Sequence, residues 1–256
     1  MRLALSSVMF SEEPIERVCA RAKRLGFDGI DIWCPFGKCR HLDDIVERLG
    51  AGGLKRVLAA NGLALSNITV YKVGFPRYAE FLGGMGGGLV VRESRYGKVA
   101  RGEARGQIAA FFEALKPEIE LAEKHGCRLA IENHSGAILN SPDSFRAFME
   151  LNPSPGRVGI ALAPYHLQKR GFSVEEAIGI CGSQLWFVYA WQHAEGAGQL
   201  PGHGPADFAP WLRALSAAGY AGFLSPFMHG ELEADAMEAA VAQACAYLDG
   251  IMGVGG

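Results

Sequence analysis

Eight short apolar runs, most of them separated by helical patterns, constrain the fold of this chain more than any other feature. The runs are rich in Val, Ile, Leu and Phe, and each has the length of a buried strand. Strands that alternate with helices in this way predict repeated βα units and a parallel sheet. The predicted strands span residues 3–7, 29–33, 64–70, 89–92, 128–133, 158–163, 185–191 and 222–227.

The number of strands indicates how this sheet is organised. Eight is the number that a closed α/β barrel needs, and 256 residues is the length that one such barrel uses. A doubly wound sheet would carry a glycine fingerprint after its first strand, whereas this chain continues as Ser6-Ser7-Val8-Met9. We therefore predict a single-domain (β/α)8 TIM barrel that spans residues 1–256.

Helical patterns fill most of the intervals between these strands. A short helix followed by a glycine-rich run over residues 76–88 is the weakest unit, and we expect the run to be a flexible connection. It is not expected to hold phosphate, because it precedes a strand and lacks a Gly-Lys-Ser/Thr ending. The clearer helices are predicted over residues 42–61, 103–125, 142–150, 174–180, 206–218 and 237–248.

Composition excludes several kinds of partner. A net charge of -2 gives no basic footprint for nucleic acid, and no uninterrupted apolar stretch is long enough to span a membrane. Neither a signal peptide nor a regular cysteine framework is present, so we expect a cytoplasmic protein with reduced thiols. The expected partner is a small molecule, and a homo-oligomer is compatible with this sequence.

Polar residues at the carboxyl ends of the strands are the candidates for chemistry, since active sites of closed α/β barrels lie at that face. Five of the seven histidines follow the last four predicted strands, and we expect them to converge around Glu132. Any one of them is equally compatible with a structural role. These histidines are His134, His166, His193, His203 and His229.

Three charged residues, one inside a predicted strand and two at the end of another, have two interpretations each. Asp31 lies inside its strand, so alternation makes it either a polar residue of the barrel interior or an ion-pair partner on the helix side. Arg92, with Glu93 beside it, could bind a phosphate or carboxylate bidentately, or could belong to a surface salt-bridge network.

Several strand-end segments resemble the xylose-isomerase-like barrel superfamily, which includes sugar-phosphate isomerases and epimerases, inosose dehydratases and the endonuclease IV group. The resemblance covers nearly the whole chain. It is carried by residues 25–33 (LGFDGIDIW), 129–134 (LAIENH), 162–166 (LAPYH) and 200–204 (LPGHG).

The resemblance implies a metal site that is substituted in this chain. Family members commonly bind one divalent metal with a Glu, an Asp, a His and a Glu from the last four strands. Glu132 matches the first ligand, but Ala163, Tyr189 and Ser225 stand at the other three positions. The site is therefore either lost, or rebuilt around Glu132 and His166 to bind Zn, Mn or Mg. The sequence leaves open whether a metal is bound.

The resemblance also implies a sugar or polyol isomerase or epimerase, with or without a substrate phosphate, that moves a proton next to a carbonyl. We expect Glu132, His166 and His193 to be catalytic. The alternatives are a non-catalytic carbohydrate-binding relative and, more remotely, an endonuclease IV-like hydrolase. The expected substrate-binding residues are Trp33, Arg92, Glu93, Asn133, His134, Tyr165, Trp191, His203 and His229.

Overall fold

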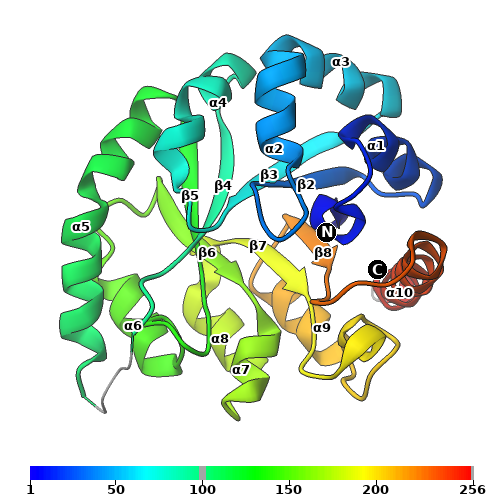
Figure 1. The fold of residues 1–256 in the computed structure, drawn as a ribbon. Helices are drawn as coiled ribbons and strands as arrows, with labels where there is room; N and C mark the ends of the chain where they lie inside the picture. The colour runs from blue at the N-terminus through cyan, green and yellow to red at the C-terminus, as the bar shows by residue number, and fades with distance from the viewer. Residues whose placement is uncertain (98–101, 255–256) are drawn as a thin grey trace.

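The computed structural model describes residues 1–97 and 102–254, and within these ranges eight parallel strands close into a barrel (Figure 1). The last strand pairs with the first, with Arg2 opposite Phe223, so no sheet edge is left open. The predicted fold class is confirmed. The strands are β1 (Arg2–Ser6), β2 (Gly29–Trp33), β3 (Ala64–Val70), β4 (Gly88–Glu93), β5 (Cys127–Glu132), β6 (Val158–Leu162), β7 (Leu185–Ala190) and β8 (Phe223–Pro226).

Helices surround the barrel in a ring, as Figure 1 shows. They are α1 (Ile15–Arg24), α2 (His41–Asp44), α3 (Gly50–Asn61), α4 (Ala79–Met85), α5 (Ala104–Lys124), α6 (Pro142–Leu151), α7 (Pro164–Lys169), α8 (Val174–Cys181), α9 (Ala209–Ala217) and α10 (Ala234–Val254). Shorter turns of helix are η1 (Ser7–Phe10), the π-helical η2 (Ile45–Leu49), η3 (Phe75–Tyr78), η4 (Gly182–Gln184) and η5 (Gly196–Gln199). The prediction of one helix over residues 42–61 was wrong, because η2 separates α2 from α3 and Gly50 adopts a positive φ of 59°.

The core has two parts, which the alternation of strand side chains separates. Large aliphatic residues of one strand face pack between the strands and the surrounding helices. The barrel interior instead combines small residues such as Ala130 and Ala161 with large rings such as Trp33 and Tyr189. The small side chains of β5 and β6 leave room for the rings that β2 and β7 point toward them.

The glycine-rich run after Pro76 is not the flexible connection that the sequence predicted. Gly83 and Gly84 belong to the last turn of α4, and Gly86 ends this helix in a left-handed conformation. Gly87 has a φ of 91°, and a Cβ atom there would lie 2.2 Å from the carbonyl oxygen of Gly126. The run therefore has the composition that a close crossing of two backbone segments requires.

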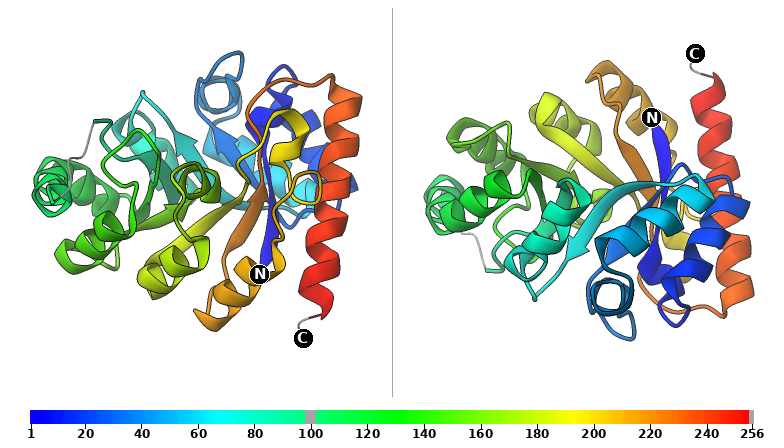
Figure 2. Two further views of the ribbon diagram at one scale, coloured as in Figure 1. Left: turned by 90° about the horizontal axis from the view of Figure 1, so that it is seen from below. Right: turned by 90° about the horizontal axis from the view of Figure 1, so that it is seen from above.

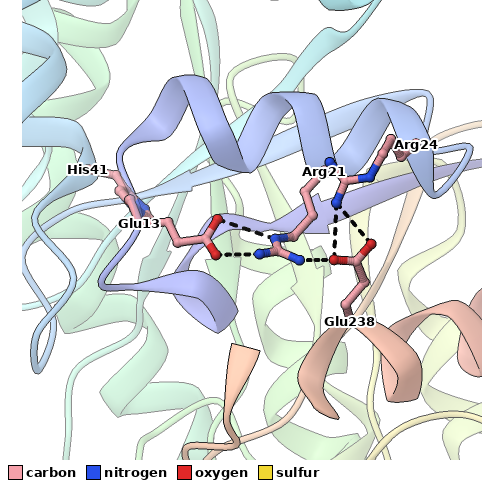
Figure 3. A network of polar contacts seen from close by, with 5 residues as sticks. All are labelled: Glu13, Arg21, Arg24, His41 and Glu238. Carbon is pink, nitrogen blue, oxygen red and sulfur yellow. Dashed lines mark hydrogen bonds and ion pairs between the residues drawn. The ribbon is translucent and has the colours of Figure 1, made fainter. Parts of the chain in front are cut away.

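A network of charged residues ties the first helix to the last, α1 to α10 (Figure 3). Arg21 is nearly buried and forms ion pairs with both Glu13 and Glu238. Arg24 pairs with Glu238 at 2.9 Å, and the carbonyl oxygen of Glu13 contacts His41 Nε2 at 2.7 Å. Figure 2 shows α10 lying along the barrel beside the N-terminal elements, so this network closes the ring of helices.

Two further observations concern the cysteines and the length of the helices. All six cysteines are free and buried within the described ranges. No helix in residues 1–97 or 102–254 has the length and apolarity needed to cross a bilayer.

Candidate active site

A cavity of about 270 Å³ opens at the carboxyl ends of the strands. Its walls are mostly aromatic, and the polar groups that reach it include one carboxyl and three imidazoles. A small cavity with apolar walls and few polar groups is typical of a site for a small ligand. The lining residues are Trp33, Phe36, Tyr71, Lys72, Tyr96, Glu132, His134, His166, Tyr189, Trp191, Phe227 and His229.

Glu132 ends β5 inside this cavity and is only 3% exposed. The hydroxyl of Tyr71, which follows β3, donates a hydrogen bond to Glu132 Oε2. Burial is the main cause that raises the pKa of Glu132 to about 8, and the charges of Asp31 and Glu93 add to it. Burial and the nearby Glu132 also raise the pKa of Tyr71 well above its usual value, so the phenol keeps its proton.

Three of the five predicted histidines meet at the cavity. The rings of His134 and His166 lie 4.0 Å apart between centroids, and His229 packs edge-on against Trp191. Burial lowers the pKa of His166 to about 2 and also lowers the pKa values of His134 and His229. His134 Nδ1 accepts a hydrogen bond from the backbone N–H of Gly136 at 3.0 Å, so its proton is on Nε2.

Aromatic rings form two stacks around the cavity. Trp33 lies between Tyr71 and Phe227, with centroid distances of 5.5 Å and 5.4 Å and interplanar angles of 12° and 8°. Trp191 stacks on Tyr165 at 4.2 Å. Of the three aromatic residues Trp33, Tyr165 and Trp191 that we expected to bind substrate, Trp33 and Trp191 line the cavity. Tyr165 supports Trp191 from outside the cavity lining.

Asp31 lies in the barrel interior, so the first of its two interpretations, a polar residue of the barrel interior, is the correct one. Ile30 and Ile32 belong to the core between strands and helices, so alternation turns Asp31 inward. Its carboxylate is fully buried and accepts hydrogen bonds from Ser6, Trp33, Asn67 and Thr69 at 2.6–2.7 Å. Burial raises the pKa of Asp31 to about 6, and the four hydrogen bonds oppose this shift.

The residues at the family's ligand positions do not fit a divalent metal. Ala163 has no donor atom, the hydroxyl of Tyr189 bonds to Thr69 at 3.1 Å, and Ser225 Oγ bonds to Ser6 Oγ at 3.0 Å. Glu132 is the remaining oxygen ligand, and no group of three or more His, Cys, Asp or Glu in the described ranges could hold a metal ion. His166 does not change this result, although its buried Nδ1 has no hydrogen-bond partner within the described chain.

Two expected substrate-binding residues lie elsewhere. Arg92 points to the helix side and pairs with Glu118 of α5, as alternation dictates for a neighbour of the inward-facing Val91. The side chain of Asn133 is fully buried, accepts from the backbone N–H of Ala163 at 2.7 Å and donates to its carbonyl oxygen at 3.0 Å. Arg92 therefore belongs to an ion pair outside the barrel, and Asn133 joins β5 to the start of α7.

Three more predicted residues lie outside the cavity lining. His203 Nε2 contacts the carbonyl oxygen of Ala240 in α10 at 2.9 Å, so this ring packs against a helix. His193 is exposed, and its ring packs against the edge of Tyr165 at 5.0 Å. Glu93 lies beside the cavity, where its Oε1 accepts from the backbone N–H of Lys72 at 3.0 Å.

Sequence reasoning missed Tyr71, although the signal that could have found it was available. Tyr71 directly follows the third predicted strand, and the same argument that selected the ends of six other strands applies to it. Lys72 next to it was also missed. Lys72 has a φ of 62° and is the one non-glycine residue with a positive φ in the described ranges. Such backbone conformations are enriched at functional sites.

Comparisons with known proteins agree with this architecture. The family model for the xylose isomerase-like TIM barrel matches residues 19–250. A search of curated proteins finds no match. Similar solved structures include a D-psicose 3-epimerase crystallised in the presence of D-fructose, which is 17% identical, with a TM-score of 0.76 over 99% of this chain and 100% of that chain.

Two further structures are similar at the same level. A 3-keto-D-glucoside 4-epimerase from E. coli is 18% identical, with a TM-score of 0.74 over 96% of this chain and 99% of that chain. The IOLI protein with a bound zinc atom is 15% identical, with a TM-score of 0.75 over 98% of both chains. At these identities the similarity shows a shared fold.

Proposed function

Because the chain belongs to the xylose isomerase-like TIM barrel family, we propose that it is a sugar or polyol isomerase or epimerase that transfers a proton next to a carbonyl. Structural neighbours that are named as sugar epimerases support this substrate class. The reaction would take place in the cavity at the carboxyl ends of the strands.

One observation carries the proposal: the Glu132 carboxyl is buried in this cavity and held by the Tyr71 hydroxyl. A carboxyl group in a water-poor cavity can take a proton from carbon and return it, since burial brings its pKa toward neutral pH. In the proposed step the Glu132 carboxylate removes a proton from the carbon beside the carbonyl. The electron pair of the C–H bond moves toward the carbonyl oxygen. Glu132 then returns the proton to the former carbonyl carbon, while the proton of the neighbouring hydroxyl passes to the former carbonyl oxygen, and this gives the isomer.

The neutral imidazoles supply the other requirement of this chemistry. The negative charge that develops on the substrate oxygen needs a hydrogen-bond donor. His134 presents its Nε2–H group in the cavity lining, because its Nδ1 is already occupied by Gly136. His166 packs against the His134 ring and supports it. Since the ligand positions do not fit a metal, the proposed step uses the residues of this chain.

The experiment that tests this function is deuterium incorporation from D₂O, followed by NMR. The probes are D-fructose, D-psicose and D-tagatose, each with EDTA and, in a parallel series, with added Mn²⁺. We expect deuterium at a carbon beside the carbonyl in EDTA, and we expect the exchange to be lost in Glu132→Gln. Glu118→Gln is the matched control, because this glutamate pairs with Arg92 outside the barrel. Exchange that requires Mn²⁺, or that survives in Glu132→Gln, would contradict the proposal.

A non-catalytic carbohydrate-binding protein is the second candidate, and the substituted ligand positions favour it. Its aromatic walls would hold a sugar ring, and no proton would move. Calorimetric binding of a probe sugar without deuterium incorporation in any of the three sugars would support this candidate over the enzyme. An endonuclease IV-like hydrolase has less support, because such an activity needs several metal ligands at this end of the barrel.

A further inference from the structure

The carboxylate of Asp31 is saturated with hydrogen bonds. Two donors share Oδ2, namely Ser6 Oγ and Trp33 Nε1, both at 2.6 Å. Two others share Oδ1, namely Asn67 Nδ2 at 2.6 Å and Thr69 Oγ1 at 2.7 Å. A carboxylate has about four lone-pair positions, so these donors occupy all of them. Asp31 is also absent from the described lining of the cavity, and it has no capacity left for a ligand.

The hydrogen bonds that Asp31 accepts orient further groups on the opposite side of the barrel. Thr69 gives its proton to Asp31, so it accepts from the hydroxyl of Tyr189, which lines the cavity. Ser6 also gives its proton to Asp31, so it accepts from Ser225. Strands β1, β2, β3, β7 and β8 are thus joined through a single carboxylate.

A third line of contacts leads from Asp31 to Glu132. Asp31 fixes the indole of Trp33 through its Nε1–H group. The indole lies nearly parallel to the ring of Tyr71, at 5.5 Å and 12°. The hydroxyl of the same Tyr71 holds Glu132 Oε2. Rotation of the indole would therefore displace the ring that positions the carboxyl.

We propose that Asp31 is the positioning residue of this site: it fixes the Trp33 indole and thereby aligns Tyr71 with Glu132. The role that this gives to Glu132 rests on the proposed function. Asp31 acts through other residues and does not touch the substrate. A structural carboxylate would stabilise the barrel without changing how Tyr71 meets Glu132, and this difference can be measured.

The test is NMR of the full chain with ¹⁵N-labelled tryptophan and ¹³Cζ-labelled tyrosine. Trp33→Phe and Tyr71→Phe assign the Trp33 indole and Tyr71 signals. The test variant is Asp31→Asn, which places an amide N–H₂ group against hydrogen-bond donors. We expect the Trp33 indole N–H to exchange with solvent about tenfold faster or more, the effect of losing a charge-assisted hydrogen bond. We also expect the Tyr71 ¹³Cζ resonance to move, although Asp31 has no hydrogen bond to this residue.

Asp28→Asn is the matched control. Asp28 precedes the same strand, and its Oδ2 accepts from the backbone N–H of Leu3 at 2.9 Å, an acceptor role that asparagine can retain. Both signals should stay in place in this variant. A folded Asp31→Asn protein with an unmoved Tyr71 resonance would overturn the proposal.

Ser6→Ala keeps the proposal testable if Asp31→Asn does not fold. It removes the donor that shares Oδ2 with Trp33, so the same two signals should move by a smaller amount. Ser94→Ala is its control, since Ser94 is a buried serine whose hydroxyl has no partner within the described chain. Equal spectra for Ser6→Ala and Ser94→Ala would contradict the role of Asp31.

The NMR readout does not depend on turnover, so the two proposals can fail separately. A Tyr71 signal that responds to Asp31→Asn in a protein without deuterium incorporation would support the positioning role and reject the reaction. Deuterium incorporation that Asp31→Asn slows through kcat, with KM retained, would support both. Incorporation that stays at the wild-type rate in folded Asp31→Asn would reject the positioning role alone.

Discussion

Replacing Asn133 with alanine should destabilise the barrel, because this side chain contacts two buried backbone groups and one of them has no other partner. It accepts from the N–H of Ala163 at 2.7 Å and donates to the C=O of Ala163 at 3.0 Å, and both residues are fully buried. A buried polar group left without a partner costs about 1–3 kcal/mol. The C=O of Ala163 also accepts from the backbone N–H of His166 at 3.2 Å, so the variant leaves one group, the N–H of Ala163, without a partner. The expected loss in the free energy of unfolding is therefore about 2 kcal/mol.

Chemical denaturation monitored by circular dichroism measures this loss, and a thermal melt gives a second estimate. For a chain of this size about 2 kcal/mol corresponds to a decrease in Tm of roughly 4–8 °C. Asn61→Ala is the control: its Nδ2 donates to the carbonyl oxygen of Val57 at 2.8 Å from a partly exposed position, so the loss should be about 1 kcal/mol or less. If Asn133→Ala loses less than about 1 kcal/mol and instead loses sugar binding, the structural role of Asn133 is refuted.

Three further predictions concern stability. Arg21→Ala should lower the free energy of unfolding by about 3 kcal/mol, because it leaves Glu13 and Glu238 without their buried partner. Arg24→Ala should lower it by less than about 1 kcal/mol, because the Arg24 side chain is 57% exposed. Equal losses in chemical denaturation would contradict this prediction. Gly87→Ala should lower the Tm well below that of Gly86→Ala, since the new Cβ meets a carbonyl oxygen at 2.2 Å and the one at Gly86 meets open space; matching melts would refute the close crossing. Below a pH of about 6.5 the unfolded state binds a proton on His166 and the folded state does not, so lowering the pH from 7 to 5 should reduce the free energy of unfolding by about 2 kcal/mol. Denaturation at several pH values checks this, and a His166→Gln variant whose stability falls with pH as much as that of the wild type would exclude the contribution.

The barrel could be predicted from the sequence because its determinants are local. Each strand is a short apolar run, and the alternation of side chains along a strand decides which of them face the interior. The same alternation could have placed Arg92 on the helix side, since its neighbour Val91 is an inward-facing apolar residue. The rule that polar residues at strand ends are candidates for chemistry applies equally to Tyr71, which directly follows the third predicted strand.

Other features depend on tertiary contacts that no local pattern carries. The partner of Asn133 is the backbone of Ala163, and a backbone group has no signature in the sequence. His203 follows a strand like the other histidines, but its ring meets the carbonyl oxygen of Ala240 from a helix near the end of the chain. The hydrogen bonds of Asp31 come from donors on three different strands, so only the closed barrel reveals that this carboxylate is saturated.

The hydrogen bonds of Tyr189 and Ser225 also affect which evolutionary changes this barrel can accept. The family's ligand set could not be introduced one substitution at a time, because each single change would break a working contact before any metal affinity appeared. A histidine at position 189 would remove the hydroxyl that bonds to Thr69, and a glutamate at position 225 would bring a second carboxylate next to Ser6, a donor of Asp31. Position 163 would still lack a ligand atom in either variant. The present arrangement is therefore separated from one with the family's ligand set by less stable intermediates.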